Sequence, residues 1–249
     1  MAIIIKNEEQ IKAMKVAGSI IADTFQLLEQ AIRPGVTTLE LDQLAEDFIK
    51  KNGATASFKG YRGYPNSICT SINEEVIHGI PSLRKLNDGD IIGIDIGAFI
   101  GGYHGDAART FAVGSVSDEA QKLIDVTRQS FYEGIKFAKA GSHLHEIGKA
   151  IQTYVESFGF SLVRDFCGHG IGKSIHESPE IPNYKPPSRG PRLMKGMTLA
   201  IEPMVNIGAY DVDVLEDGWT VVTQDGMLSA HYENTIVITD GEPEILTLK

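Results

Sequence analysis

Cysteine is scarce in this sequence, and so are long apolar runs. Only Cys69 and Cys167 occur among 249 residues, too few to staple a secreted domain with disulfides, so we interpret both as buried thiols in a reducing compartment. No stretch approaches the ~18 apolar residues of a membrane span. The apolar start ends at Lys6, far short of a signal peptide's apolar core. We therefore predict a cytoplasmic protein that does not enter a membrane.

Positive charge is also in deficit. Thirty-three acidic residues against 23 basic ones give a formal charge of −10 and a pI near 5.2. This is the wrong sign for binding phosphates over a broad surface, which argues against specific nucleic-acid binding, although a local basic patch could still dock on a ribosome. The apolar fraction of 42% and the charged fraction of 22% are typical of a globular protein with a real core.

Apolar residues recur at steps of three and four in four segments, which is the pattern of amphipathic helices. We predict helices over 7–32, 37–53, 117–140 and 143–158. Thr37 and Glu40 have the spacing of a capping box at the start of the second helix. Glycine stands at or just beyond each helix end, as helix termination favours. The helices therefore come as two pairs.

Runs rich in Ile, Val and Thr lie between and after the helix pairs and predict strands. They cover residues 67–72, 90–100, 103–113, 197–205, 219–223 and 228–239. Prolines crowd the segment 179–191, which we interpret as an ordered surface loop rather than a linker. We expect residues 1–249 to form a single α+β domain.

A faint internal repeat links the two parts of the chain. "GDIIGID" ends at Asp95 and "GMTLAIE" ends at Glu202, while His78 in "VIHGIP" and His176 in "SIHESP" lie upstream. Chance similarity is one explanation. The other is a duplicated unit of two helices plus strands, whose halves are related by a pseudo-twofold axis and send acids to one site.

The first of these acids lies in the middle of an apolar strand. Strand alternation puts Asp95 on the face of Gly93 and Gly97, where we expect empty space, and the isoleucines on the other face. Burying a carboxylate there costs several kcal/mol unless a cation or a donor receives it. Asp106 follows in the next strand beyond a Gly-Gly hairpin turn, so the two acids should be neighbours.

Further acids and a histidine complete the pattern. Glu202 and Glu233 lie inside the strands predicted over 197–205 and 228–239, and His169 projects between glycines in "CGHGIG". Singly, each is more often a hydrogen-bonded structural residue. Together the four carboxylates carry a charge of −4 that two divalent cations would neutralise, so the set predicts a dinuclear metal site.

The donor set indicates the metal and the chemistry. Oxygen-rich ligands with one nitrogen and no thiolate favour Mn²⁺, Fe²⁺, Co²⁺ or Zn²⁺ over a structural zinc site. Two such ions about 3.5–4 Å apart share a bridging water, lower its pKa and polarise a carbonyl. The predicted reaction class is hydrolysis.

Five motifs together resemble the type I methionine aminopeptidases, and the resemblance runs from the first helix to the last strand. They are "SICTSINEEVIHGIP", "GIDIGAFIGGYHGDAARTF", "CGHGIGKSIHESP", "LAIEPM" and "YENTIVIT". The resemblance implies the pita-bread fold of that family, in which two pseudo-symmetric halves surround a dinuclear centre. This agrees with the internal repeat.

The resemblance also implies roles for particular residues. Asp95 would chelate one metal, Asp106 and Glu233 would bridge both, and His169 with Glu202 would complete the other. Glu202 would also shuttle a proton from the attacking water to the leaving amine. Two histidines that are not ligands, His78 and His176, would hydrogen-bond the substrate and the developing oxyanion.

A pocket for the methionine side chain is implied as well. Its lining would include Tyr61, Tyr64, Cys69 and Trp219. The sequence departs from the pattern at Phe58, where some relatives have Cys, at Ile175, where some have Phe, and at Gly97, where some have Thr. A monovalent cation, Na⁺ or K⁺, is implied near Asn73, Glu75 and Ser229.

The implied function is removal of the N-terminal methionine from nascent or newly made proteins when the second residue is small. We expect a monomer. One rival is an Xaa-Pro-specific peptidase of the same fold, although such chains usually carry an extra N-terminal domain. The other rival is a non-catalytic binding module, which should have lost metal ligands.

Overall fold

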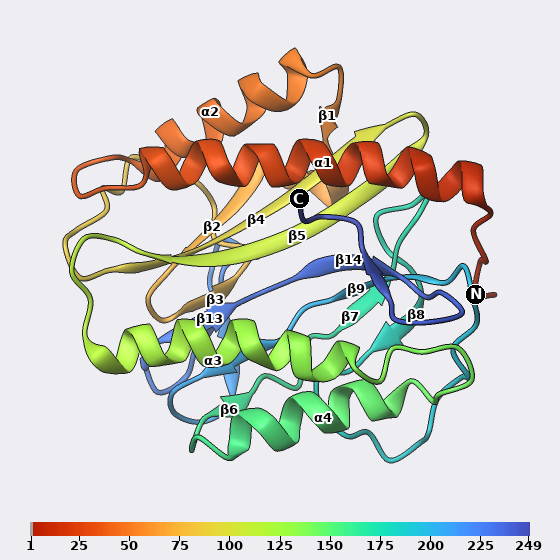
Figure 1. The fold of residues 1–249 in the computed structure, drawn as a ribbon. Coiled ribbons are helices and arrows are strands. Elements are labelled where there is room, and N and C mark those ends of the chain that lie inside the picture. The colour runs from red at the N-terminus through yellow and green to blue at the C-terminus, as the bar shows by residue number, and fades with distance from the viewer. Residues whose placement is uncertain (1) are drawn as a thin grey trace.

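Two pairs of helices lie on opposite outer sides of the molecule, and strands fill the space between them (Figure 1). The computed structural model describes residues 2–249. The first pair is α1 (Glu8–Ala31) and α2 (Thr38–Lys51), and the second is α3 (Asp118–Ile135) and α4 (His145–Glu156). The prediction of two helix pairs is confirmed. Within residues 2–249, no helix has the length and apolar character needed to cross a membrane.

Local sequence signals account for the helix starts. The Thr37 side chain accepts a hydrogen bond from the Glu40 backbone N–H, and the Glu40 carboxylate accepts one from the Thr37 backbone N–H. The predicted capping box is therefore present. Asn7 and Gln10 form a second one at the start of α1. The third helix ends at Ile135, earlier than the predicted 140. Beyond it the backbone N–H groups of Phe137 and Ala138 bond to carbonyls three residues before them, which is the pattern of turns.

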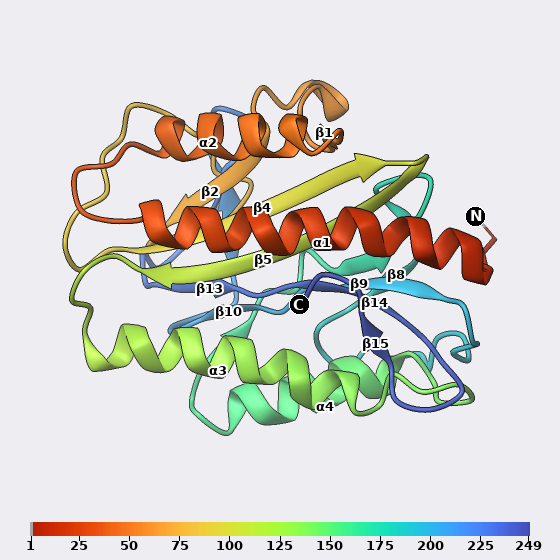
Figure 2. The ribbon, with the colours of Figure 1, turned by 45° about the horizontal axis from the view of Figure 1, so that its top comes forward.

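The first half of the fold is built on a long antiparallel hairpin. Strands β4 (Ile91–Ile100) and β5 (Tyr103–Ala112) are joined by the predicted Gly-Gly turn, in which both glycines have positive φ. On the other edge of β4 lie β2 (Ile68–Ile72) and the short β1 (Thr55–Ala56). Helices α1 and α2 pack on this sheet and bury one apolar core with it (Figure 2).

The second half contains shorter strands in several sheets. One sheet has the order β15-β14-β9-β7-β8, a second has the order β13-β10-β6, and a third, which borrows a strand from the first half, has the order β11-β12-β3. The strands are β3 (Glu75–Ile77), β6 (Ser161–Leu162), β7 (Gly168–Gly170), β8 (Glu177–Ile181), β9 (Thr198–Ile201), β10 (Met204–Asn206), β11 (Val212–Val214), β12 (Val221–Thr223), β13 (Ser229–His231), β14 (Asn234–Val237) and β15 (Glu244–Ile245). Helices α3 and α4 bury a second core against them.

Two strand predictions are wrong in the same way. The segments 197–205 and 228–239 are each split in two, at Glu202 and at Glu233, so that each segment serves two sheets. Pro203 follows Glu202 and has no N–H for the ladder, which explains the first break. At the second break the Glu233 backbone pairs with Ala108 of β5 instead. The predicted loop 179–191 is also partly wrong, because its first residues belong to β8.

Candidate metal centre and substrate cavity

A cavity of about 580 Å³ lies where the two halves meet. Its lining includes almost all the residues singled out from the sequence: Phe58, Tyr61, Tyr64, Cys69, His78, Asp95, Asp106, His169, His176, Glu202, Trp219 and Glu233. Asp95 and Asp106 project from the hairpin, His169 from β7, and the two glutamates from the strand breaks. The fold therefore gathers side chains that are far apart in the sequence.

The predicted ligands form a compact, buried group. Ligand atoms of Asp106, His169 and Glu233 lie within 4.8 Å of one another, and these residues are 3%, 7% and 1% exposed. The His169 Nε2 atom lies 3.8 Å from Asp106 Oδ2 and 3.6 Å from Glu202 Oε1. Its Nδ1 is 2.9 Å from the Gly170 carbonyl, to which it donates, so Nε2 is left with a free lone pair facing the acids.

Several buried oxygens of this group have no hydrogen-bond partner among the described residues. They are Asp95 Oδ1, Asp106 Oδ1 and Glu233 Oε1. A buried acceptor without a partner costs roughly 1–3 kcal/mol, and more when it is charged. A divalent cation would supply the missing partner and offset the clustered negative charge. The donor set therefore fits a metal site.

The electrostatics of the group agree with this fit. Burial raises the pKa of Asp106 well above its usual range, and the nearby Asp95 and Glu202 carboxylates raise it further. Burial likewise raises the pKa of Glu233, with Asp106 as the next cause. Burial lowers the pKa of His169 to about 3, which keeps the ring neutral, as a metal ligand must be. Protons and cations therefore compete for the same oxygens.

One buried histidine of this region was missed by the sequence analysis. His231 Nε2 lies 3.5 Å from Glu202 Oε2 and has no hydrogen-bond partner within residues 2–249. Its ligand atom lies within 4.8 Å of those of Glu202 and Glu233. The available signal was its position two residues before Glu233, on the same face of the predicted strand 228–239.

The two predicted substrate-binding histidines lie on different supports. His78 follows β3 with a φ of 60°, a strained conformation for a residue with a side chain. Its ring meets Phe166 and Trp219 edge-on, and burial lowers its pKa to about 4. His176 is exposed, stacks on Tyr61, and its Nδ1 lies 3.0 Å from the Tyr61 hydroxyl. Both histidines line the cavity.

The predicted pocket residues are together, with two corrections. Tyr64 meets Trp219 edge-on at 5.1 Å, and Cys69 pairs with Asp95 across β2 and β4. Ile175 is buried in the same apolar cluster as Phe58, Tyr64 and Cys69 but is not among the residues that line the cavity. The space beside Asp95 is not empty at Gly97: a Cβ there would lie 2.8 Å from the Phe58 ring.

The residues named for a monovalent cation are neighbours with partners of their own. The Ser229 backbone N–H donates to the Asn73 carbonyl at 2.9 Å. The Glu75 carboxylate pairs with Arg84 at 2.8 Å and accepts from the Ile72 backbone N–H. The side chain of Glu75 is thus already satisfied, and the monovalent cation stays a prediction.

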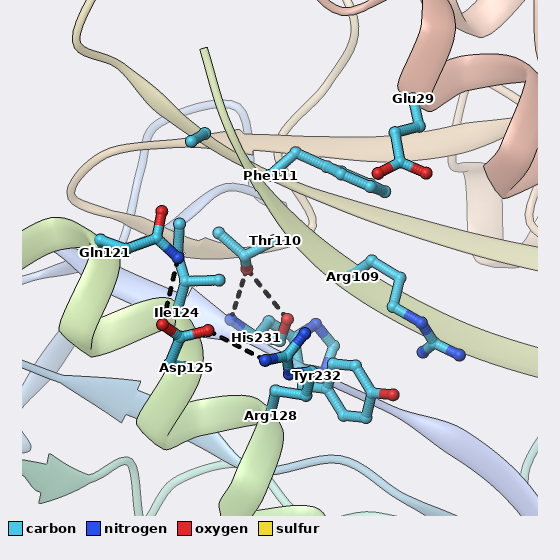
Figure 3. Close-up of a pocket in the computed structure, with 11 residues that line it drawn as sticks. Glu29, Arg109, Thr110, Phe111, Gln121, Ile124, Asp125, Arg128, His231 and Tyr232 are labelled. Atoms are coloured by element: carbon cyan, nitrogen blue, oxygen red, sulfur yellow. Dashed lines mark hydrogen bonds and ion pairs between the residues drawn. The ribbon is translucent and has the colours of Figure 1, made fainter. Parts of the chain in front are cut away.

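A second cavity, of about 240 Å³, lies beside β5, α3 and the start of the break after β13 (Figure 3). Its lining includes Arg109, Thr110, Arg128, His231 and Tyr232. None of the five predicted ligands lines it. This second cavity is separate from the first one. Its lining includes His231 and Tyr232, which directly precede Glu233 of the first cavity.

Comparisons with known proteins match the whole chain. The model of metallopeptidase family M24 matches residues 12–240. A methionine aminopeptidase of Clostridium acetobutylicum is 62% identical over 247 residues, which is 99% of each chain. The crystal structure of methionine aminopeptidase from Thermotoga maritima superposes with a TM-score of 0.97 at 45% identity, covering 100% of both chains.

The chain therefore belongs to metallopeptidase family M24, and the predicted pita-bread fold is confirmed. The two relatives that match over their full length are both methionine aminopeptidases. An Xaa-Pro dipeptidase from Bacillus anthracis is less similar: the identity is 27%, the TM-score is 0.78, and the match covers 98% of this chain but only 62% of that one. The chain carries a divalent-metal site of this family.

Proposed function

We propose that this chain removes the N-terminal methionine from newly made proteins whose second residue is small. Water adds across the first peptide bond: the C–N bond breaks, the methionine leaves as a free amino acid and the shortened protein keeps a new amino terminus. The observation that carries the proposal is the gathering of the five predicted ligands around one cavity, with three buried carboxylate oxygens that have no partner in the part of the chain that the structure describes.

The metal-holding role falls to the buried group. Asp95, Asp106, His169, Glu202 and Glu233 would hold two divalent cations, with Mn²⁺, Fe²⁺, Co²⁺ and Zn²⁺ as the ions that suit these donors. When bound, such ions lower the pKa of a water and polarise the scissile carbonyl. The −4 charge of the acids is then balanced, which removes the cost of keeping them together in a buried site.

The protein's own residues would move the proton and hold the substrate. Burial raises the pKa of Glu202 to about 8 before any cation is bound, and a carboxyl group at this position can act as a general acid and base. We assign it the transfer from the attacking water to the leaving amine. His78 and His176 would donate hydrogen bonds to the substrate, and the Tyr61 hydroxyl orients the His176 ring.

Selection of methionine would come from the aromatic end of the cavity. Tyr61, Tyr64, Phe58 and Trp219 surround a space beside Cys69, which burial keeps as a neutral thiol by raising its pKa. A flexible, unbranched thioether fits such an apolar lining and makes favourable contacts with ring edges. Charged or branched first residues would be excluded by desolvation cost and by shape.

A peptide competition tests the proposal. The purified chain, loaded with Mn²⁺ or Co²⁺, is assayed on Met-Ala-Ser, Met-Leu-Ser and Ala-Pro-Ser. We expect rapid release of methionine from Met-Ala-Ser, slow release from Met-Leu-Ser and no cleavage of Ala-Pro-Ser. Faster cleavage of Ala-Pro-Ser would favour the Xaa-Pro peptidase, and an inert protein that binds no metal would favour the binding module. The identities above already disfavour the first rival.

We further propose that residues 1–249 act as one metallopeptidase domain, because both halves line the same cavity. A cytoplasmic location, a monomeric state, docking on the ribosome and the monovalent cation remain predictions of the sequence. Size-exclusion chromatography with light scattering checks the monomer, which should elute at a mass near 27.1 kDa.

A further inference from the structure

A buried arginine spans the seam between the two halves. Arg109 lies on β5 of the first half. Its neighbour Ala108 pairs through the backbone with Glu233 of the second half. One guanidinium nitrogen donates to the backbone carbonyl of Glu233, and to that of Ala108 at 2.7 Å. The other donates to the Asn234 side-chain oxygen at 2.5 Å. The guanidinium therefore holds the Glu233 carbonyl and the neighbouring Asn234 side chain of the second half.

The guanidinium is itself held rigidly. It lies 4.3 Å from the centre of the Tyr232 ring and 5.1 Å from that of Phe25, which reaches it from α1. Figure 3 shows Arg109 extending from β5 toward Tyr232. Contacts of this kind between a cation and aromatic faces gain strength in a desolvated setting. Because the guanidinium is planar and is fixed between the two aromatic rings, its N–H groups define where the acceptor oxygens must lie.

Further hydrogen bonds join the same two strands. The Glu233 backbone N–H donates to the Ala108 carbonyl at 2.9 Å, and the Asp106 N–H donates to Thr235 Oγ1 at 3.0 Å. Thr110 Oγ1 bonds both backbone groups of His231, as Figure 3 shows. Hydrogen bonds thus connect the backbone segments that carry Asp106 and Glu233 at every second residue. Among the residues that make these hydrogen bonds, Arg109 is the only one with a charged side chain that takes part.

We propose that Arg109 is a positioning residue that sets the separation of the Asp106 and Glu233 carboxylates by clamping the Glu233 carbonyl across the seam. The inference rests on the proposed ligand roles of these two acids. It predicts that losing the fork lets Glu233 drift, which weakens the second of two metal-binding events more than the first. Replacing groups that orient metal ligands typically costs 10–100-fold in metal affinity.

The test uses Arg109→Lys, which keeps the charge but not the planar fork, with Arg128→Lys as the matched control. Arg128 lines the same small cavity but pairs with Asp125 and makes no bond to Glu233. Mn²⁺ binding to the metal-free proteins is titrated by calorimetry, and magnetic coupling between the two ions is recorded by electron paramagnetic resonance. For Arg109→Lys we expect about tenfold or greater loss of affinity in the second event and a weakened coupling signal, and no change for Arg128→Lys.

Unaltered affinity and coupling in a folded Arg109→Lys protein would overturn the inference, even if its melting temperature fell, because a purely structural link lowers stability without moving the ions. Asp106→Asn separates this failure from failure of the proposed site. If Asp106→Asn loses metal and Arg109→Lys does not, only the clamp is wrong. If neither changes metal binding, the ligand assignment itself is wrong.

Discussion

The two halves of the molecule present their acids in different ways. Asp95 and Asp106 sit inside two long, regular strands of one hairpin, each held by hydrogen bonds along a continuous ladder. Glu202 and Glu233 sit at breaks, where a strand leaves one sheet for another. The regular strands carry the shorter aspartates. The breaks carry glutamates, and the Glu233 backbone pairs with Ala108 of another sheet.

This contrast gives the site a rigid side and a supported side. The rigid side is held by the hairpin and the core beneath it, with the Thr235 hydroxyl of the second half bonded to the Asp106 backbone. The supported side needs Arg109 and the Ala108 pairing to hold the Glu233 backbone. Substitutions that cut these supports should therefore disturb the second half before the first.

The largest expected effect is the loss of a bridging carboxylate from either half. Asp106→Asn and Glu233→Gln each replace an anion by a neutral amide, so both should lose metal and lower kcat/KM by at least about 10³-fold. Atomic absorption and peptide assays measure the two quantities. If only one variant loses metal, the two halves do not share the ions equally, and the bridging role of the other acid is wrong.

The next effect concerns an ion pair that ties the chain's start to β8. Lys6 Nζ lies 2.6 Å from Glu177 Oε2, with side chains only 2% and 6% exposed. Glu177→Gln leaves a buried ammonium without its partner, which should cost about 3–5 kcal/mol in the free energy of unfolding. Urea titration measures this cost.

An exposed pair provides the control for that prediction. Lys15 and Glu244 also lie 2.6 Å apart but are 43% and 49% exposed, so Glu244→Gln should cost at most about 1 kcal/mol. Lys6→Met combined with Glu177→Gln should recover part of the lost stability. Equal costs for the buried and exposed pairs would show that burial does not set their strength.

A smaller change is expected at a histidine outside the ligand group. His78→Ala should retain the metals and lower kcat by about 10²-fold, because a hydrogen bond to the transition state is removed. Metal content and kcat are measured on the same preparation. Loss of metal in this variant would place His78 among the ligands and contradict its assigned role.

The smallest effect tests how tightly the rigid side is packed. In Gly97→Ala the new Cβ would lie 2.7 Å from Ser57 Cβ and 2.8 Å from the Phe58 ring, so overpacking should cost about 1–3 kcal/mol. Gly93→Ala is the matched control, since its nearest atoms lie at 3.6 Å. Thermal unfolding compares the two. A larger loss at Gly93 would mean that Phe58 moves freely and does not close the wall beside Asp95.

Much of this protein follows from local sequence patterns. Helical periodicity predicted both helix pairs, and the Thr37–Glu40 spacing predicted a cap that is present. Four acids in apolar runs, together with His169 between glycines, identified five residues that the fold brings into one cavity. These inferences succeed because helix periodicity, capping and the cost of burying a charge act over a few residues or do not depend on the partner's position.

The sequence by itself determined the helix pairs, the long hairpin and the need for cations beside the buried acids. Only the tertiary structure decided where the strands break, that His231 lies beside Glu202 and that Phe58 fills the space above Gly97. Each of these depends on which distant segment packs alongside. The alternation of side chains within a strand does not specify which distant segment packs against it. The segment that ends the strand pairing or fills the space beside a glycine is therefore known only from the folded structure.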